Sequence, residues 1–305
     1  MGGSRWSNDD WSSYSTKSAT VMASARSAGL SDSAARAQYF KQSKIKDYLD
    51  PKGIVLRESR DSEANPNSNA IIIGLDVTGS MGAIAEHMAT KSLGKLFEGI
   101  LDRTPVVDPH IMLMGIGDIF SDRAPLQVSQ FEADIRIAEQ LTDLWLEGGG
   151  GGNSFESYDL PWYFAARKTS IDCFEKRGKK GYIFTIGDEM PPPQKLTKRQ
   201  LNESLGITEQ ADMDAGQALK EAQEKYNVFH IIVEQGSYAS RAKKQVTDAW
   251  NGVLGKRAIG LNNYEYLSEV ILSVMEVSEG ADPEEVLGSW EVPEVRKTVR
   301  YALGL

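Results

Sequence analysis

The chain has 305 residues, a net charge of −9, and apolar (41%) and charged (25%) fractions that are ordinary for a globular protein, so we expect one large domain with flanking segments. The acidic balance argues against general affinity for nucleic acid, since phosphate binding needs a basic surface. The single cysteine, Cys173, excludes an intramolecular disulfide framework and suits a reducing compartment, and no apolar run is long enough to span a membrane. We therefore expect a soluble, cytoplasmic protein that binds neither nucleic acid nor membrane.

Residues 1–68 are rich in serine, alanine and charge, and we expect them to form an N-terminal extension that is helical in part. The alanine-rich stretch 19–48 predicts two short helices. Residues 57–69 are polar and turn-rich, which is typical of a linker leading into a strand. We interpret the extension as a segment that packs against the main domain rather than as a separate functional module.

The main domain begins with the apolar run 70–75, which predicts a strand buried on both faces of a parallel sheet. The run ends at Asp76, and Thr78 and Ser80 follow before an amphipathic helix predicted over 80–101. One carboxylate and two hydroxyls are thus gathered at the carboxyl end of a central strand. Open α/β sheets bind their ligands at that edge.

These oxygens favour a hard divalent cation. One carboxylate and two hydroxyls suit Mg²⁺, with Mn²⁺ as the alternative, and offer nothing to a soft metal. Three protein oxygens leave an octahedral ion with open positions for water or for an oxygen of a partner. The sequence therefore predicts a magnesium site at Asp76, Thr78 and Ser80.

The spacing Asp76-x-Thr78-x-Ser80 resembles the metal-ion-dependent adhesion site (MIDAS) of the von Willebrand factor A (vWA) family, whose signature is Asp-x-Ser/Thr-x-Ser. The resemblance implies a vWA-like domain over residues 69–280. It also implies metal-dependent protein binding, and two further loops that complete the site.

The next elements along the chain are a strand predicted over 110–115, a short antiparallel edge strand over 125–128 and a helix over 131–147. Asp118 and Asp122 follow the first of these strands. Their position after a strand makes them candidate neighbours on the rim of the same site.

A run of five glycines, 148–152, precedes Asn153, Ser154 and Glu156. The loop lacks the Lys-Ser/Thr pair of a nucleotide-binding loop, and no strand precedes it. In the vWA resemblance this loop is the second contributor to the metal site, where the family usually places Gly-Gly-Thr. The residues leave three alternatives open, namely the Asn153 amide oxygen, the Ser154 hydroxyl, or Glu156 acting directly or through water.

A helix predicted over 158–176 and a buried strand over 180–186 lead to Gly187-Asp188-Glu189. This turn resembles the Thr-Asp-Gly turn of the vWA family with its residues rearranged. By that resemblance, Asp188 is the third-loop carboxylate and holds the ion directly or through water.

Two more strands are predicted over 228–233 and 258–261, and two more helices over 241–254 and 266–279. Alternating strands and helices imply right-handed crossovers. We therefore expect an α/β fold with a doubly wound, mainly parallel central sheet and helices on both faces (vWA/Rossmann-like). Residues 281–305 are expected to form a C-terminal tail that packs on the domain or on a partner.

These features favour a binding protein over an enzyme. The cation would capture an acidic residue of a partner protein, and the resemblance implies an intracellular multiprotein assembly, including one linked to an AAA+ ATPase. A metal-dependent, phosphatase-like hydrolase is the alternative, but Thr78 stands where such enzymes carry a second aspartate. A structural or assembly protein with an incidental metal site is the third hypothesis.

Overall fold

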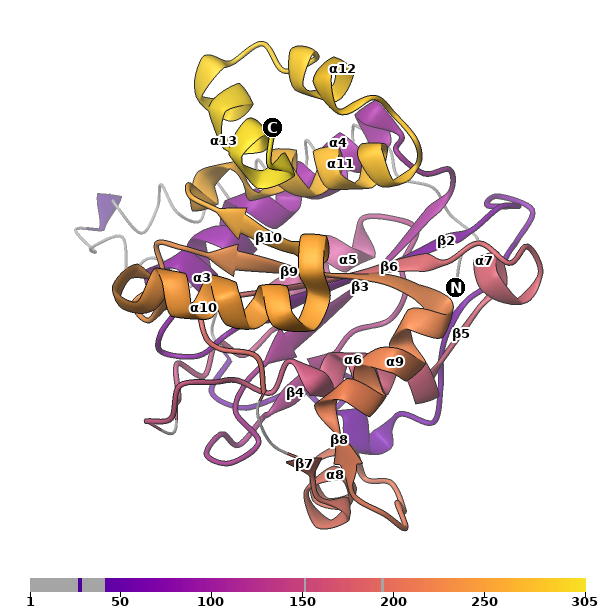
Figure 1. Ribbon diagram of the computed structural model, residues 1–305. Helices are drawn as coiled ribbons and strands as arrows, with labels where there is room; N and C mark the ends of the chain where they lie inside the picture. Colours follow the sequence, from indigo (N-terminus) through magenta and orange to yellow (C-terminus); the bar gives the residue numbers. More distant parts are fainter. Residues whose placement is uncertain (1–26, 29–41, 151, 193–194) are drawn as a thin grey trace.

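The structure of the protein is a computed structural model that describes residues 27–28, 42–150, 152–192 and 195–305 (Figure 1). Most of the predicted N-terminal extension, including residues 19–26 and 29–41 of the two helices expected over 19–48, lies outside the described residues, and residues 42–48 form turns and bends rather than a helix. The main domain is an α/β fold built around a six-stranded sheet in the order β10–β9–β6–β2–β3–β4.

The strands of the central sheet are β2 (Asn69–Asp76), β3 (Pro109–Ile116), β4 (Leu126–Val128), β6 (Gly181–Gly187), β9 (Tyr226–Val233) and β10 (Ala258–Leu261). Two small sheets pair β1 (Arg57–Ser59) with β5 (Thr169–Ile171) and β7 (Lys195–Leu196) with β8 (Met213–Asp214). Every residue of β2 is buried, as expected of an apolar strand in the middle of a covered sheet.

The prediction of a doubly wound, mainly parallel sheet is wrong, because the central sheet is mixed. The strand β4 runs antiparallel to β3, with Met114 opposite Val128 and Ile116 opposite Leu126, whereas β2 pairs in parallel with β3 and β6. Only residues 117–125 join β3 to β4, and this connection contains no crossover helix. A short connection of that kind returns the chain antiparallel.

Helices lie against both faces of the sheet (Figure 1). The α-helices are α3 (Ala83–His87), α4 (Leu93–Arg103), α5 (Arg136–Thr142), α6 (Asp159–Arg167), α7 (Asp172–Glu175), α8 (Lys198–Leu205), α9 (Ala215–Lys225), α10 (Ala239–Leu254), α11 (Leu267–Ser278), α12 (Pro283–Gly288) and α13 (Pro293–Leu303). A π-helical turn, Met88–Ser92, joins α3 to α4. Short 3₁₀ turns occupy Pro51–Gly53, Gly255–Arg257 and Tyr264–Tyr266.

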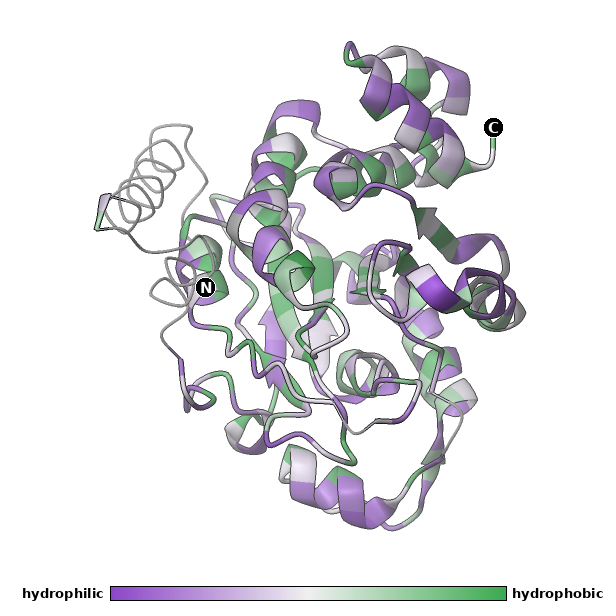
Figure 2. Cartoon of the chain, turned by 90° about the vertical axis from the view of Figure 1, so that its left-hand side faces the viewer, coloured by the Kyte–Doolittle hydropathy of each residue, from purple (hydrophilic) through white to green (hydrophobic). Residues whose placement is uncertain are grey.

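Alternate strand residues enter two separate apolar cores. Ile71 and Ile73 pack with α4 and α11 on one face, whereas Ile72 packs with α6, α9 and α10 on the other. Successive side chains of a strand point to opposite faces, so a run of consecutive apolar residues supplies both cores. Figure 2 shows hydrophobic residues along the central strands.

Two predicted helices are shorter than expected. The helix over 131–147 is reduced to α5, because the backbone of Glu132 exchanges two hydrogen bonds with Ile111 and so extends the sheet. The helix over 158–176 is interrupted by β5, which pairs with β1 of the predicted linker. In both cases strand pairing between distant segments overrides the local helical pattern.

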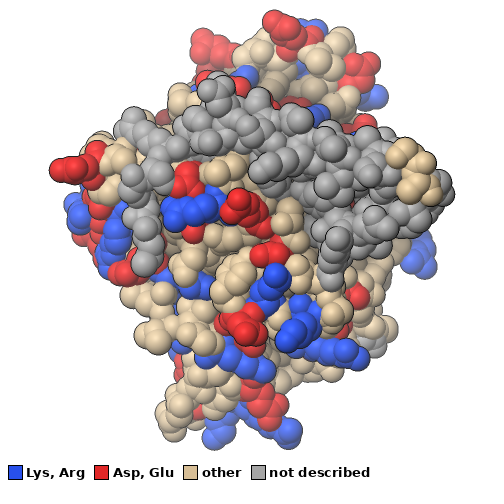
Figure 3. Space-filling view, turned by 180° about the vertical axis from the view of Figure 1, so that it is seen from behind, with Lys and Arg blue, Asp and Glu red and all other residues tan. Residues whose placement is uncertain are grey.

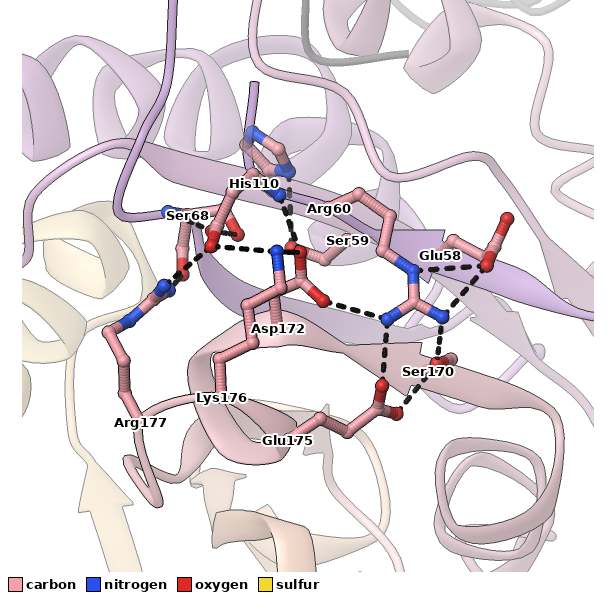
Figure 4. A network of polar contacts seen from close by, with 11 residues as sticks. Glu58, Ser59, Arg60, Ser68, His110, Ser170, Asp172, Glu175, Lys176 and Arg177 are labelled. Atoms are coloured by element: carbon pink, nitrogen blue, oxygen red, sulfur yellow. Dashed lines mark hydrogen bonds and ion pairs between the residues drawn. The ribbon is translucent and has the colours of Figure 1, made fainter. Parts of the chain in front are cut away.

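A polar network fastens the linker to the body of the protein (Figure 4). The Arg60 guanidinium contacts both Asp172 and Glu175 of α7 at 2.7 Å, and Arg177 contacts Asp61 at 2.8 Å. A single exposed ion pair contributes little to the stability of the fold. Here, however, the Asp172 side chain is buried and is bound by several donors. The surface in Figure 3 shows positive and negative side chains interspersed, as such pairing requires.

The C-terminal tail forms α12 and α13, which lie against α11 and β10. The Tyr301 hydroxyl donates to Glu234 Oε1 at 2.5 Å, and the Arg103 guanidinium lies 4.0 Å from the centre of the Trp290 ring. These contacts place the tail on the domain. Within the part of the chain that the structure describes, no helix combines the length and the apolar character that a membrane span needs.

Candidate metal centre

The first loop of the candidate site follows β2 directly. Asp76 is fully buried, and its Oδ1 accepts hydrogen bonds from the Thr78 backbone N–H (2.9 Å) and the Thr78 hydroxyl (2.6 Å). The Tyr158 hydroxyl donates to the other oxygen, Oδ2, at 2.7 Å. The Thr78 and Ser80 hydroxyl oxygens lie 3.2 Å apart. The three side chains expected to bind a cation therefore face one point.

The third loop meets the first at the same point. Asp188 follows β6, which is the neighbour of β2 in the sheet, and the Ser80 hydroxyl donates to Asp188 Oδ1 at 2.6 Å. A further loop, which the sequence did not indicate, supports both residues from behind. The backbone N–H of Tyr238 donates to Asp188 Oδ2 (2.8 Å), and that of Ser237 donates to the Ser80 carbonyl (3.0 Å).

The glycine-rich loop contacts the first loop through its backbone. Gly79 donates to the Gly149 carbonyl at 2.6 Å, and Gly148 donates to the Val77 carbonyl at 3.1 Å. A Cβ atom at position 79 would lie 3.0 Å from the Gly149 oxygen, tighter than side chains normally tolerate. Glycine at this position thus permits the close approach of the two loops.

The three candidate ligands of the second loop, Asn153, Ser154 and Glu156, differ in what they contact. The Asn153 amide nitrogen donates to Asp118 Oδ2 at 2.9 Å, so Asn153 connects the loop to the end of β3. The Ser154 carbonyl accepts from the Met190 backbone N–H at 3.0 Å. Glu156 is 1% exposed, and Asp76 is the charge that most affects its pKa. Of the three, Glu156 is the side chain that the structure associates with Asp76.

Five buried carboxylates come together around this point, and Glu189 is a member that the sequence did not indicate. They are Asp76, Asp118, Glu156, Asp188 and Glu189. Among the ion pairs of the described residues, none joins these carboxylates to a lysine or arginine. The Oε2 atoms of Glu156 and Glu189 are buried and lack a hydrogen-bond partner within the described chain. Fully ionised, the cluster would carry more negative charge than its protein surroundings balance.

Burial and repulsion from neighbouring carboxylates raise the pKa values of Asp76, Glu156 and Glu189. Burial, with a smaller contribution from Asp188, raises the pKa of Asp76 to about 7. Burial and the charge of Asp76 raise the pKa of Glu156 to about 10 and that of Glu189 to about 8. Each shift measures how unfavourable the ionised form is without a nearby positive charge.

These observations fit a cation, because buried oxygens without partners and carboxylates without counter-charges are what a bound cation would satisfy. In the described ranges, no three His, Cys, Asp or Glu side chains are arranged as a metal centre. A cation at this point would accordingly depend on the hydroxyls of Thr78 and Ser80 together with carboxylates. Such a mixed oxygen set suits Mg²⁺ or Mn²⁺.

The floor of the site is aromatic. His230 is fully buried, stacks on Trp250 at 3.5 Å, and is 2.9 Å from the Thr185 hydroxyl through Nδ1. Burial lowers its pKa well below the ordinary value, so the ring is neutral. The Trp250 indole N–H donates to the Glu189 carbonyl at 2.9 Å. His230 is therefore a packing residue. The stacked pair of His230 and Trp250 supports the third loop through the bond from Trp250 to the Glu189 carbonyl.

Gly236→Ala is expected to weaken divalent-cation binding by about tenfold or more, because the new methyl group would overlap the Cβ, Cγ and Oδ2 atoms of Asp188. Mn²⁺ titration followed by electron paramagnetic resonance measures the affinity. The matched control is Gly252→Ala, since a Cβ at that helical position meets no atom within 4 Å. Equal Mn²⁺ affinities for the two variants would contradict a role for Asp188.

Comparison with known proteins assigns no family. A scan against protein-family models found no match, and neither did a search of curated proteins. Two crystal structures of the pilus adhesin SpaC from Lactobacillus rhamnosus GG, one of them in an open conformation, are similar to this chain at 9% and 8% identity, each with a TM-score of 0.42. The matches cover 75% of this chain but 31% and 32% of the adhesin chains, so this chain spans about a third of their length. A TM-score this low carries no argument about fold or function.

Proposed function

We propose that this chain is a metal-dependent protein-binding module that captures an acidic residue of a partner protein through a bound Mg²⁺ or Mn²⁺ ion. The observation that carries the proposal is the convergence of separate turns on one point. The Ser80 hydroxyl contacts Asp188 at 2.6 Å and lies 3.2 Å from the Thr78 hydroxyl, beside the buried Asp76. The resemblance of this loop to the MIDAS signature of the vWA family supports the same interpretation.

Asp76, Thr78, Ser80 and Asp188 would hold the ion, with Glu156 and Glu189 near it. When bound, the cation supplies a positive charge and open coordination positions. The chain holds its own oxygens in place for the ion, since Tyr158 binds one Asp76 oxygen and the Tyr238 backbone binds one Asp188 oxygen. These supporting bonds fix the two carboxylates before any ion arrives.

An acidic partner requires that the site retain positive charge after the cation binds. In the metal-free chain, burial and the neighbouring carboxylates raise the pKa of Glu156 to about 10 and that of Glu189 to about 8, so these two acids resist ionisation more than Asp76 does. Neutral acids at the periphery leave more of the ion's charge to attract an outside carboxylate.

The class of partner protein is inferred from the resemblance to the vWA family, not from any particular residue of this chain. We infer that the protein acts in the cytoplasm within a multiprotein assembly, including one linked to an AAA+ ATPase. The single cysteine and the acidic net charge suit that setting.

The test is direct observation of carboxylate binding to the metal-loaded chain. With Mn²⁺ bound, we expect the methyl protons of acetate to relax faster by nuclear magnetic resonance, because a carboxylate enters the first coordination sphere of the paramagnetic ion. Acetamide, which has the same shape without the charge, should show little effect, and EDTA should abolish the enhancement. Equal relaxation of acetate and acetamide, or no effect of Mn²⁺ on either, would refute acid capture.

A further inference from the structure

We propose that the acidic residue captured by this site is flanked in the partner by a large apolar side chain, which docks on Phe120, Phe155 and Met190. This inference rests on the proposed function, because it names the partner segment that the same site would recognise. We call these three residues the apolar rim.

The apolar rim and the acid cluster share the same two loops. Phe155 and Met190 form a parallel β-bridge, and the Met190 N–H donates to the Ser154 carbonyl at 3.0 Å. Glu156 and Glu189 each adjoin one of these bridged residues, and Met190 packs partly against the apolar core while keeping some of its surface exposed. Both glutamates are buried, whereas both bridged residues are half-buried.

Phe120 extends the apolar rim to the loop that follows β3. It is 48% exposed, and its ring contacts Phe155 edge to face, with centroids 5.8 Å apart. The Phe120 backbone N–H donates to Asp118 Oδ1 at 2.9 Å, which ties its position to the acid cluster. A half-exposed phenylalanine pair held this way presents apolar surface to solvent beside the site.

The space beneath the pair is too small to be the binding pocket. A cavity lined by Phe120, Phe155 and Asp159 measures about 10 Å³, which admits about one water molecule. A partner side chain would therefore lie across the exposed ring of Phe120 rather than enter the cavity. Contact of this kind accommodates leucine, methionine or an aromatic residue without strict shape selection.

A single segment of the partner has to reach both the cation site and the apolar rim. Phe155 is bonded directly to Glu156, and Phe120 is two residues from Asp118, so the rim lies within about 7 Å of backbone from the acids. A residue next to the captured acid in an extended peptide covers a similar distance. An acidic residue with an apolar neighbour is accordingly the segment that satisfies both surfaces together.

The experiment uses two blocked pentapeptides, Gly-Leu-Asp-Leu-Gly and Gly-Ser-Asp-Ser-Gly, titrated into the Mn²⁺-loaded full chain and followed by paramagnetic relaxation. We expect the leucine peptide to bind about three- to tenfold more tightly, from partial burial of one leucine. Phe120→Ser should bring the two affinities together while leaving Mn²⁺ affinity and binding of the serine peptide unchanged. Phe120→Leu should restore the preference, which separates apolar contact from a general disturbance of the loop.

Val292→Ser is the matched control, since Val292 is 49% exposed and lies in the C-terminal tail. Equal metal-dependent binding of both peptides by the unaltered chain would overturn the inference and leave acid capture intact. A leucine preference that survives Phe120→Ser would also overturn it, because a different surface would then be responsible. If neither peptide bound in the presence of Mn²⁺, the proposed function itself would fail.

Discussion

Asp76→Ala is expected to abolish stabilisation of the protein by Mg²⁺ while leaving the fold intact. In the unaltered chain, saturating Mg²⁺ should raise the melting temperature by several degrees, since an ion that binds only the folded state stabilises it by mass action. The variant should show no shift, because Asp76 is the carboxylate that accepts from the Thr78 hydroxyl, which lies 3.2 Å from the Ser80 hydroxyl. Thermal unfolding with and without Mg²⁺ measures the effect.

The same substitution should not destabilise the metal-free protein severely. It removes a buried carboxylate whose ionised form is unfavourable, and this gain opposes the loss of the hydrogen bonds from Thr78 and Tyr158. Asp159→Asn is the control, because Asp159 is equally buried but its raised pKa arises from burial, with no contribution from the acid cluster. A Mg²⁺-induced shift that persists in Asp76→Ala would contradict the assignment of the ion to this loop.

Without metal, the protein is expected to lose stability as the pH rises from 6.5 to 9. The folded-state pKa values of Asp76 and Glu189 are raised to about 7 and about 8, whereas unfolded Asp and Glu titrate near about 4. The folded state therefore holds protons that the unfolded state has lost, so the free energy of unfolding falls with rising pH. The stabilisation is fully present below about pH 4 and is lost as the pH rises through 7 for Asp76, through 8 for Glu189 and towards 10 for Glu156. We expect the melting temperature in EDTA to fall by about 5 °C over this window.

Burial also raises the pKa of Asp159 to about 7, so the contribution of the acid cluster is isolated by substitution and by added metal. The buried histidines His110 and His230 have lowered pKa values and so act in the opposite direction, but their influence ends near the ordinary histidine value, below most of this window. Glu189→Gln should flatten the decline, because the amide cannot ionise. Mg²⁺ should offset the decline increasingly at higher pH, since the cation takes the place of the lost protons. A stability that is constant from pH 6.5 to 9 in EDTA would contradict the raised pKa values.

The first loop of the candidate site was predictable because its signals are local. Consecutive apolar residues in 70–75 report a strand covered on both faces, and Asp76, Thr78 and Ser80 follow it within one turn. The position of Asp188 was predictable for the same reason, since it also ends a buried strand. The antiparallel edge strand expected at 125–128 is present as β4. The sequence could not predict which second-loop residue lies near the metal site, because a run of glycines does not fix the direction of the side chains that follow it.

The residues that the sequence did not indicate all depend on contacts between distant segments. Tyr158 reaches Asp76 across 82 positions, and the Tyr238 backbone reaches Asp188 across 50. Glu189 adjoins Asp188, but its burial and its unpaired oxygen are properties of the folded chain, in which the distant Trp250 donates to its carbonyl. The mixed character of the sheet likewise follows from how β4 returns along β3.

The amino-acid sequence by itself determined which segments become buried strands and which of them end in oxygen-bearing turns, because burial periodicity and turn chemistry act over a few residues. Only the tertiary structure decided which turns share one edge, since the sheet order sets β2 between β6 and β3 and brings Asp76, Asp188 and Asp118 together. The same packing decided their electrostatics, because removing carboxylates from water without a counter-charge raises their pKa values in a way that no local pattern encodes.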